Sequence, residues 1–250
     1  VNELYTTPTW TPPTYAWELD TLYVDPNATG NNDGSSWSNA YTDAREAFIS
    51  TTENCEIWIA QGTYIRNATD RNSVFGWSKD SVMIYGGFEG GETSRNQRDW
   101  DANPTIFSGD LGILGDNSDN AYTVFTGPFG QHNYSLIDGI KITGGNADVD
   151  SYPDWNTVGG GMTIDTDVDF VEIKNVEFYD NYAKQGGALS AYGFSGDSIY
   201  IRLENVVAHN NTGRSSAFGH IRASNVAPIE FEMVNCLIYE NNALESLPSQ

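Results

Sequence analysis

Apolar and polar positions alternate in four segments that can be aligned along the second half of the chain. The segments are IDGIKITGGNA (137–147), IKNVEFYDNYA (173–183), LENVVAHNNTG (203–213) and MVNCLIYENNA (233–243). Each contains a small or amide-bearing residue, then alternating apolar positions, then a turn with Asn. An alternation of period two predicts a short strand, and the turn marks its end.

Two sets of asparagines recur at intervals of 30 residues. They are Asn175, Asn205 and Asn235 in one set and Asn181, Asn211 and Asn241 in the other. Gly139 lies another 36 residues before the first set. Asparagines at the same turn of successive coils can stack, with their side-chain amides hydrogen-bonded along the axis. Corner glycines such as Gly186 supply the positive φ that a sharp bend needs.

Two further series of short strands keep the same order within the repeat. One is GGGMTID (159–165), GGALSAY (186–192) and FGHIRAS (218–224), and the other is DFVEIKN, SIYIRLEN and PIEFEMVN. Three short strands in each repeat predict an all-β fold, a right-handed single-stranded parallel β-helix. A β-sandwich is the alternative, but its hairpins would not maintain a period of 30 residues.

The first half of the chain follows this pattern less regularly and contains one helical segment. Within SWSNAYTDAREAFIST (36–51), one helical face would carry Tyr41, Ala44, Ala47 and Phe48. Ser38 or Asn39 is the expected N-cap. The end coil of a solenoid exposes apolar residues and strand edges, so we interpret this helix as an N-terminal cap.

The predicted domain organisation is an extended arm followed by one β-helix. Residues 1–21 are rich in Pro and Thr, which is typical of an extended arm, and residues 22–250 form the β-helix. No amphipathic helix follows the last repeat, so we expect the β-helix to be truncated at its C-terminal end. Cys55 and Cys236 should be unpaired, because several coils stacked about 4.8 Å apart separate them and a disulfide needs Cα atoms within about 7 Å.

The net charge narrows the range of partners. The chain has 34 acidic and 12 basic residues, a net charge of -22, which disfavours nucleic acid and anionic lipid. Divalent cations and neutral sugars fit such a surface better. No apolar run approaches the roughly 18–20 residues that span a bilayer, and no signal peptide opens the chain. An exported protein would already have lost its signal.

Alternating aspartates form the candidate metal site. Asp165, Asp167 and Asp169 would lie on one face of a strand, and oxygen ligands of this density suit Ca²⁺. Further candidate ligands are Asp148, Asp150 and Asp154. The alternative is a solvated acidic strand face, and we expect no other cofactor.

Candidate bases for a polysaccharide lyase gather in the last two coils. They are Arg202, His209, Arg214, His220 and Arg222. His209 occupies the repeat position of Tyr179 and Tyr239, which indicates a structural role, whereas His132 lies in a polar turn and should be exposed. No hydrolase elbow, zinc-protease or phosphate-loop motif occurs.

The segment SRNQRDWD (94–101) is expected to fix a long loop to the body. Arg95 and Arg98 could do this by ion pairs, and the alternative is a site where Trp100 stacks on a sugar.

Several ordered segments resemble a known family. LYVDPNATGNNDGSSWSNAYTDAREAF, CEIWIAQGTYI, MIYGGFEGGETSRNQRDWDANPTIFSGDL, LIDGIKITGGNA and GGGM are together similar to the choice-of-anchor Q group of secreted β-helix proteins, across most of residues 22–243. This resemblance implies a bacterial cell surface and type IX secretion. Phe178, Asn181 and GGAL (186–189) also resemble short motifs of polymorphic outer-membrane protein passengers, which are adhesin-like.

The resemblance implies a secreted cell-surface adhesin or structural stalk module. Its partners would be a surface glycan or protein ligand and the export and anchoring machinery. The alternative function is a polysaccharide lyase or another glycan-processing β-helix enzyme fragment.

Overall fold

The computed structural model describes residues 19–66, 69–127, 134–149, 158–165, 170–193, 199–223 and 229–244. Parallel strands dominate this part of the chain and form four sheets, which confirms the predicted all-β class. No helix in it is long and apolar enough to cross a membrane. The predicted arm falls almost wholly outside these residues.

Two long sheets form adjoining walls. In spatial order, sheet one consists of β1 (Asp20–Val24), β2 (Cys55–Ala60), β5 (Val82–Phe88), β8 (Ser135–Asp138), β12 (Phe170–Lys174), β16 (Ile199–Glu204) and β20 (Ile229–Val234). Sheet two consists of β3 (Gly62–Ile65), β6 (Thr105–Ser108), β9 (Lys141–Thr143), β13 (Glu177–Tyr179), β17 (Val207–His209) and β21 (Leu237–Tyr239).

Two sheets of shorter strands complete each turn of the chain. Sheet three consists of β10 (Asn146–Ala147), β14 (Tyr182–Ala183), β18 (Thr212–Gly213) and β22 (Asn242–Ala243). Sheet four consists of β4 (Phe75–Gly76), β7 (Phe125–Thr126), β11 (Met162–Asp165), β15 (Leu189–Gly193) and β19 (Gly219–Ala223).

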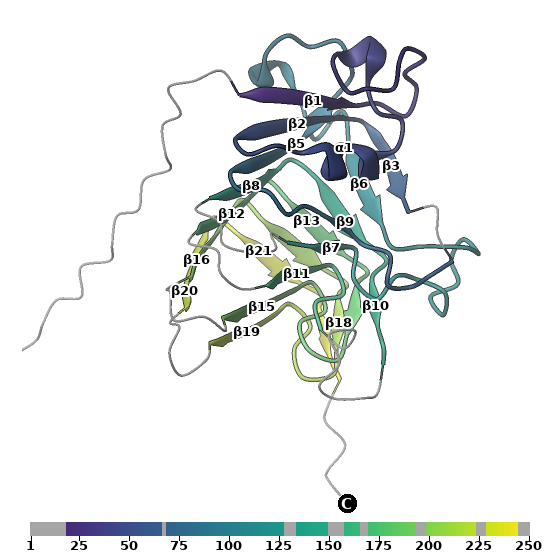
Figure 1. The fold of residues 1–250 in the computed structure, drawn as a ribbon. Helices are drawn as coiled ribbons and strands as arrows, with labels where there is room; N and C mark the ends of the chain where they lie inside the picture. Colours follow the sequence, from purple (N-terminus) through teal and green to yellow (C-terminus); the bar gives the residue numbers. More distant parts are fainter. Residues whose placement is uncertain are drawn as a thin grey trace, which may run out of the picture.

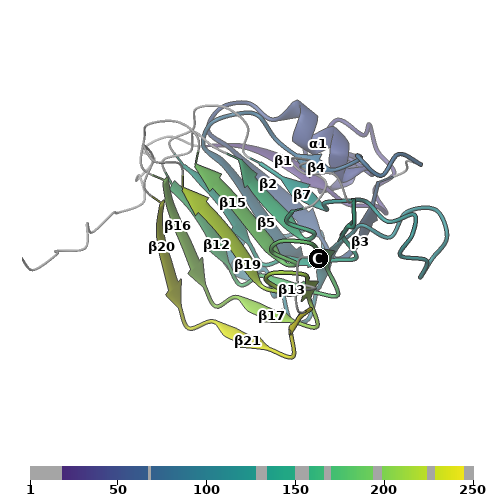
Figure 2. The ribbon, with the colours of Figure 1, turned by 90° about the horizontal axis from the view of Figure 1, so that it is seen from below.

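The chain visits the four sheets in turn, so that each coil lies on the one before it. Figure 1 shows this as a gradual colour change from purple β1 to yellow β20, and Figure 2 shows β20, β16 and β12 side by side. Phe170 pairs with Tyr200, and Tyr200 pairs with Glu230, which confirms the 30-residue repeat. Ser135 pairs with Val171, which confirms the longer step of 36 residues.

The number of strands in a coil differs from the prediction. The later coils have four strands and not three, because the two-residue strands of sheet three form separate short walls. A strand of two residues, such as Tyr182–Ala183, is too short to produce a period-two pattern.

The inward side chains of successive coils stack in columns. Ile142, Phe178 and Ala208 occupy one such column and are fully buried. Phe107 and Phe125 pack edge to face in the earlier coils, with ring centroids 4.7 Å apart. The core is therefore a continuous apolar filling between the four sheets, which is the main source of stability in such a fold.

Both predicted asparagine ladders are present. In the outer ladder Asn205 Nδ2 donates to Asn175 Oδ1 (3.1 Å), and Asn235 Nδ2 donates to Asn205 Oδ1 (2.6 Å). These three residues have φ between 50° and 55°, a left-handed conformation that Asn tolerates better than most residues. In the inner ladder Asn181 Nδ2 donates to Asn211 Oδ1 (3.0 Å), and both side chains are buried.

A single α-helix, α1 (Ala44–Ser50), occurs among the described residues and packs against β1 and β4. Ala44, Ala47 and Phe48 form its buried face, and the Phe48 ring meets the Phe125 ring edge to face with centroids 5.7 Å apart. The helix thus packs on the core at the N-terminal coil, as predicted.

The predicted cap of this helix is wrong. Asp43 caps α1, with its carboxylate accepting a hydrogen bond from the Arg45 backbone N–H (2.9 Å). Ser38 and Asn39 lie instead in a separate 3₁₀ turn (Trp37–Asn39) that Ser36 caps. Ser36 and Asp43 are both capping residues and lie close together in the chain. The sequence therefore does not show which of them begins the α-helix.

The two cysteines are free, as predicted. Cys55 is buried in β2, the second strand of sheet one, and Cys236 is half-buried after β20, the last strand of that sheet. Burial raises the pKa of the Cys55 thiol to about 11, so this side chain behaves as an inert core residue.

Candidate functional site

The described residues enclose a polar cleft of about 710 Å³ on the outer side of sheets two and three. The segment between β6 and β7 forms one wall, and the corner between the two sheets forms the other. Side chains that line the cleft include Asp110, Asn117, Asn146, Tyr182, Asn210 and Thr212.

One wall of the cleft is a column of side chains from three successive coils. Asn146 pairs with Tyr182, and Tyr182 pairs with Thr212 in sheet three. Ala147 and Ala183, the next residues along the same strands, are fully buried. Because successive side chains of a strand point to opposite faces, the column points outward. Adjacent members of the column are separated by one strand spacing, about 4.8 Å.

The opposite wall is a loop that its own carboxylates fix in place. The Asp110 carboxylate accepts a hydrogen bond from the Gly115 backbone N–H (3.0 Å), and Asp119 accepts one from Ile113 N–H (2.8 Å). The Asn146 side-chain amide donates to Asn117 O (2.6 Å) and joins the loop to sheet three. The cleft is therefore largely formed without a ligand, as binding sites usually are.

Arg71 connects both walls from an earlier coil. Its guanidinium donates to Asn120 O (2.6 Å) and Asn146 O (2.8 Å), and it forms an ion pair with Asp148 (2.8 Å). It also lies 4.1 Å over the Tyr122 ring. These contacts give Arg71 a structural role. Its positive charge also neutralises the Asp148 carboxylate, which lines the cleft.

The chemistry of the cleft suits a neutral ligand rich in hydroxyl groups. Its lining combines amides, hydroxyls and tyrosine rings, and Asp110 and Asp180 have no ion-pair partner among the described residues. An anionic ligand would meet these carboxylates unfavourably. The buried Asn120 side chain, which lines the cleft, keeps its Oδ1 without a hydrogen-bond partner in the described structure.

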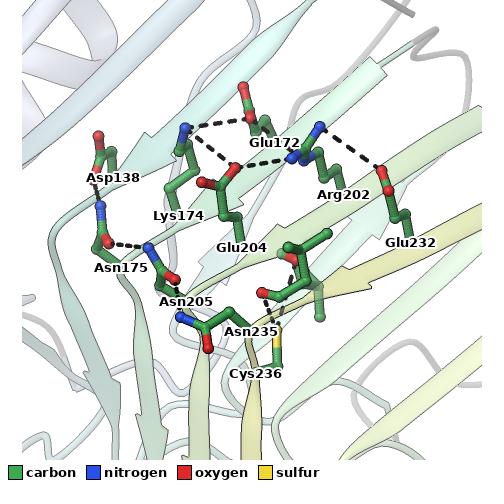
Figure 3. A network of polar contacts seen from close by, with 12 residues as sticks. Asp138, Glu172, Lys174, Asn175, Arg202, Glu204, Asn205, Glu232, Asn235 and Cys236 are labelled. Carbon is green, nitrogen blue, oxygen red and sulfur yellow. Dashed lines mark hydrogen bonds and ion pairs between the residues drawn. The ribbon is translucent and has the colours of Figure 1, made fainter. Parts of the chain in front are cut away.

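A second polar surface covers the outer face of sheet one (Figure 3). Charges alternate in two columns that run across the strands, with Asp138, Lys174 and Glu204 in one column and Glu172, Arg202 and Glu232 in the other. Lys174 lies 3.3 Å from Glu204, and Arg202 lies 3.1 Å from Glu204 and 3.8 Å from Glu232. Opposite charges on neighbouring strands stabilise their register.

The structure distributes the predicted bases over three sheets and a connecting segment, and it brings His220 and Arg222 close to each other on β19. Arg202 lies on sheet one within the charge columns, and His209 lies on sheet two. His220 and Arg222 lie on sheet four, where burial and then Arg222 lower the pKa of His220. Arg214 is exposed between β18 and β19.

His209 has the structural role that its repeat position predicts. Its ring stacks between Tyr179 and Tyr239, with centroids 5.6 and 5.1 Å away. Its Nε2 is 2.8 Å from the Glu177 carboxylate, which also pairs with Lys141 (2.7 Å). These contacts stack the imidazole on both faces and engage its Nε2.

Most of the predicted calcium ligands lie outside the residues that the structure describes. Asp167, Asp169, Asp150, Asp154 and the side chain of Asp165 lie outside the described residues, as does His132. Asp148 is described and pairs with Arg71. Within the described ranges, no group of three or more His, Cys, Asp or Glu side chains is arranged to hold a metal ion.

The predicted loop contacts of residues 94–101 are confirmed. Arg98 forms an ion pair with Asp138, and both side chains are about nine-tenths buried. Arg95 lies 3.2 Å from Glu56 and also donates to the Tyr85 hydroxyl. Trp100 stacks with Arg98 at 5.0 Å, so the loop is fixed to sheet one.

Sequence reasoning missed the cleft. Arg71 belongs to no repeat, and the outward column of sheet three lies on strands too short to be recognised. The 30-residue spacing of Tyr182 and Thr212 was the available signal.

Comparisons with protein-family models, with curated proteins and with solved structures find no match to this chain.

Proposed function

We propose that this chain is a right-handed parallel β-helix that acts as a secreted cell-surface adhesin or stalk module and binds a neutral surface glycan in its polar cleft. The parallel coils and their continuous core support the β-helix. Connections between parallel strands of one sheet are right-handed in about 98% of cases, which supports the handedness.

The observation that carries the binding proposal is the column Asn146, Tyr182 and Thr212. It presents an amide, an aromatic ring and a hydroxyl from consecutive coils toward one cleft. Such groups bind sugars through hydrogen bonds and ring stacking. A chain of linked sugars could extend along the column, because the stack repeats the wall coil by coil.

The resemblance to the choice-of-anchor Q group supports a location on a bacterial surface. Under this proposal, the type IX machinery exports the protein and anchors it to the cell. The net charge of -22 agrees with a neutral ligand. Two hydrogen-bonded asparagine ladders would give a stalk its rigidity.

Affinity electrophoresis tests the glycan site. The chain should be retarded by at least one polysaccharide from a panel of neutral glycans, with polygalacturonate as the anionic comparison. The double variant Tyr182→Ala, Thr212→Ala should lose this retardation. Asn242→Ala is the matched control, because Asn242 follows Thr212 in the same column but does not line the cleft.

Retardation by no neutral glycan, or equal retardation of all variants, would overturn the glycan proposal. An ultraviolet assay for unsaturated uronate products tests the enzymatic alternative. Turnover that disappears in Arg202, Arg214 or His220 variants would replace adhesion by lyase activity as the function.

A further inference from the structure

The edge formed by β20, β21 and β22 exposes residues whose counterparts in the preceding coil are buried. Met233 is 40% exposed and Ile238 is 41% exposed, whereas their pairing partners Leu203 and Ala208 are fully buried. Leu237 is 56% exposed. No described strand pairs with the outer side of this edge.

The hydrogen bonds of the inner asparagine ladder all run the same way, from one coil to the next. Their direction determines which group a partner must present to the edge. Asn181 donates from its backbone N–H and its Nδ2 to Asn211 Oδ1, and Asn211 donates in the same way to Asn241 Oδ1. Within the described residues, the Asn241 backbone N–H has no equivalent acceptor. Continuing the pattern requires a side-chain oxygen one coil further along.

The outer ladder runs in the opposite direction. Asn205 Nδ2 donates back to Asn175 Oδ1, and Asn235 Nδ2 donates back to Asn205 Oδ1. Asn235 Oδ1 is therefore ready to accept from one more amide. An asparagine contains both a donor and an acceptor, so a single residue type satisfies both ladders.

The charge columns add a third requirement. The second column reads Glu172, Arg202 and Glu232, so negative, positive and negative side chains alternate across the strands (Figure 3). Glu232 and Asn235 are the outermost labelled members of their rows in that view. A basic residue opposite Glu232 would continue the alternation.

A second copy of the chain does not meet these requirements. The outer side of β1 is already hydrogen-bonded, because Tyr23 N–H donates to Gly34 O (3.0 Å) and Tyr41 N–H donates to Tyr23 O (2.9 Å). These bonds block head-to-tail pairing of two copies along sheet one. Tail-to-tail docking would be antiparallel and would bring the row of Glu230 and Glu232 against the same acidic row.

We propose that the β20–β21–β22 edge docks one further parallel coil of the same repeat type. That coil carries asparagines next to Asn235 and Asn241, a basic residue next to Glu232, and apolar residues next to Met233 and Ile238. The two ladders, the charge column and the apolar column fix its direction and its register. This inference is independent of the proposed glycan binding.

Extension of the intact chain tests the proposal. A copy of residues 221–243 is added after Gln250, which continues the 30-residue period, with the copied Glu232 changed to Lys. The first control keeps Glu at that position, and the second changes the copied Asn235 and the copied Asn241 to Ala. Amide hydrogen exchange is measured for β20–β22, with β12 as the internal reference in every version.

The Lys extension should slow the exchange of the Asn241 amide by about tenfold or more and raise the Tm by several degrees. Both controls should give clearly less protection. Equal protection of the Asn241 amide in all three versions, or no protection in the Lys extension, would overturn the residues proposed for the docked coil. A concentration-dependent dimer of the unextended chain that protects the same amides would show that a second copy is the occupant.

Discussion

At the scale of single residues, asparagine performs two separate tasks in this chain. At 175, 205 and 235 it adopts a left-handed turn and links neighbouring coils from outside. At 181 and 211 it is buried and satisfies backbone groups that would otherwise lack partners. Buried polar groups are tolerated only when they are hydrogen-bonded, so the inner ladder should contribute more to stability.

Replacing Asn211 by Ala tests the inner ladder. The change removes the Nδ2 donor to Phe178 O (2.9 Å) and the acceptor of the Asn181 backbone N–H (3.2 Å). Leaving such groups buried without partners should lower the free energy of unfolding by about 2–4 kcal/mol in urea titrations. The exposed Asn242→Ala should cost less than about 0.5 kcal/mol. A similar loss for both variants would contradict the role of the ladder.

Glu177 should make stability depend on pH. Burial raises its pKa, but hydrogen bonds from Lys141 and His209 outweigh burial and bring the pKa below its usual value. A carboxyl with a lowered folded pKa stabilises the protein above its unfolded pKa, and this contribution disappears as the pH falls through the folded pKa.

The difference in urea midpoint between the parent and Glu177→Gln should therefore be full near about pH 6 and should shrink as the pH falls below the unfolded pKa of about 4.3. Glu230→Gln, at an exposed position of β20, controls for the loss of one negative charge. A difference that stays constant with pH would show that Glu177 does not act through its charge.

At the scale of elements, short strands acquire their stability from the coils on either side. A two-residue strand such as β14 pairs with β10 and β18 and has no stability of its own. Loops are also stabilised by contacts with the coils. The buried Arg98–Asp138 ion pair fixes the segment 94–101 to sheet one.

Replacing Arg98 by Ala should release this loop. The change leaves the Asp138 carboxylate buried without its cation, which typically costs about 3–5 kcal/mol. Trypsin should then cleave at Arg95 faster than in the parent. Arg45→Ala removes an exposed pair with Glu46 and should cost less than about 1 kcal/mol. Unchanged cleavage at Arg95 would contradict the anchoring role.

The sequence predicted the long repeating strands, the helix and the loop contacts of residues 94–101, but it missed the short strands of sheet three and the cap at Asp43. The spacing of Asn175, Asn205 and Asn235 indicated the register, because an in-register stack keeps equivalent residues one coil apart. The cap at Asp43 and the wall around Arg71 depend on local competition and on contacts distant in sequence. The cleft arises where such a non-repeating loop meets the repeating wall.

At the scale of the whole molecule, the described strands form a stack in which each strand pairs only with strands of the neighbouring coils. Stability in such stacks is close to a sum of coil and interface contributions. Such a stack requires that successive repeats lie on top of one another in parallel register along the whole described chain.

Distances between paired spin labels test that claim most directly. Thr63, Lys141 and Leu237 belong to one column of sheet two, with five strand steps between Thr63 and Leu237 and three between Lys141 and Leu237. After replacement of Cys55 and Cys236, we expect backbone separations of about 24 Å and about 14 Å, at about 4.8 Å per step. Their expected difference is about 10 Å, and both pairs share the label at Leu237. Equal distances, or a shorter distance for the Thr63 pair, would contradict the stacked coils.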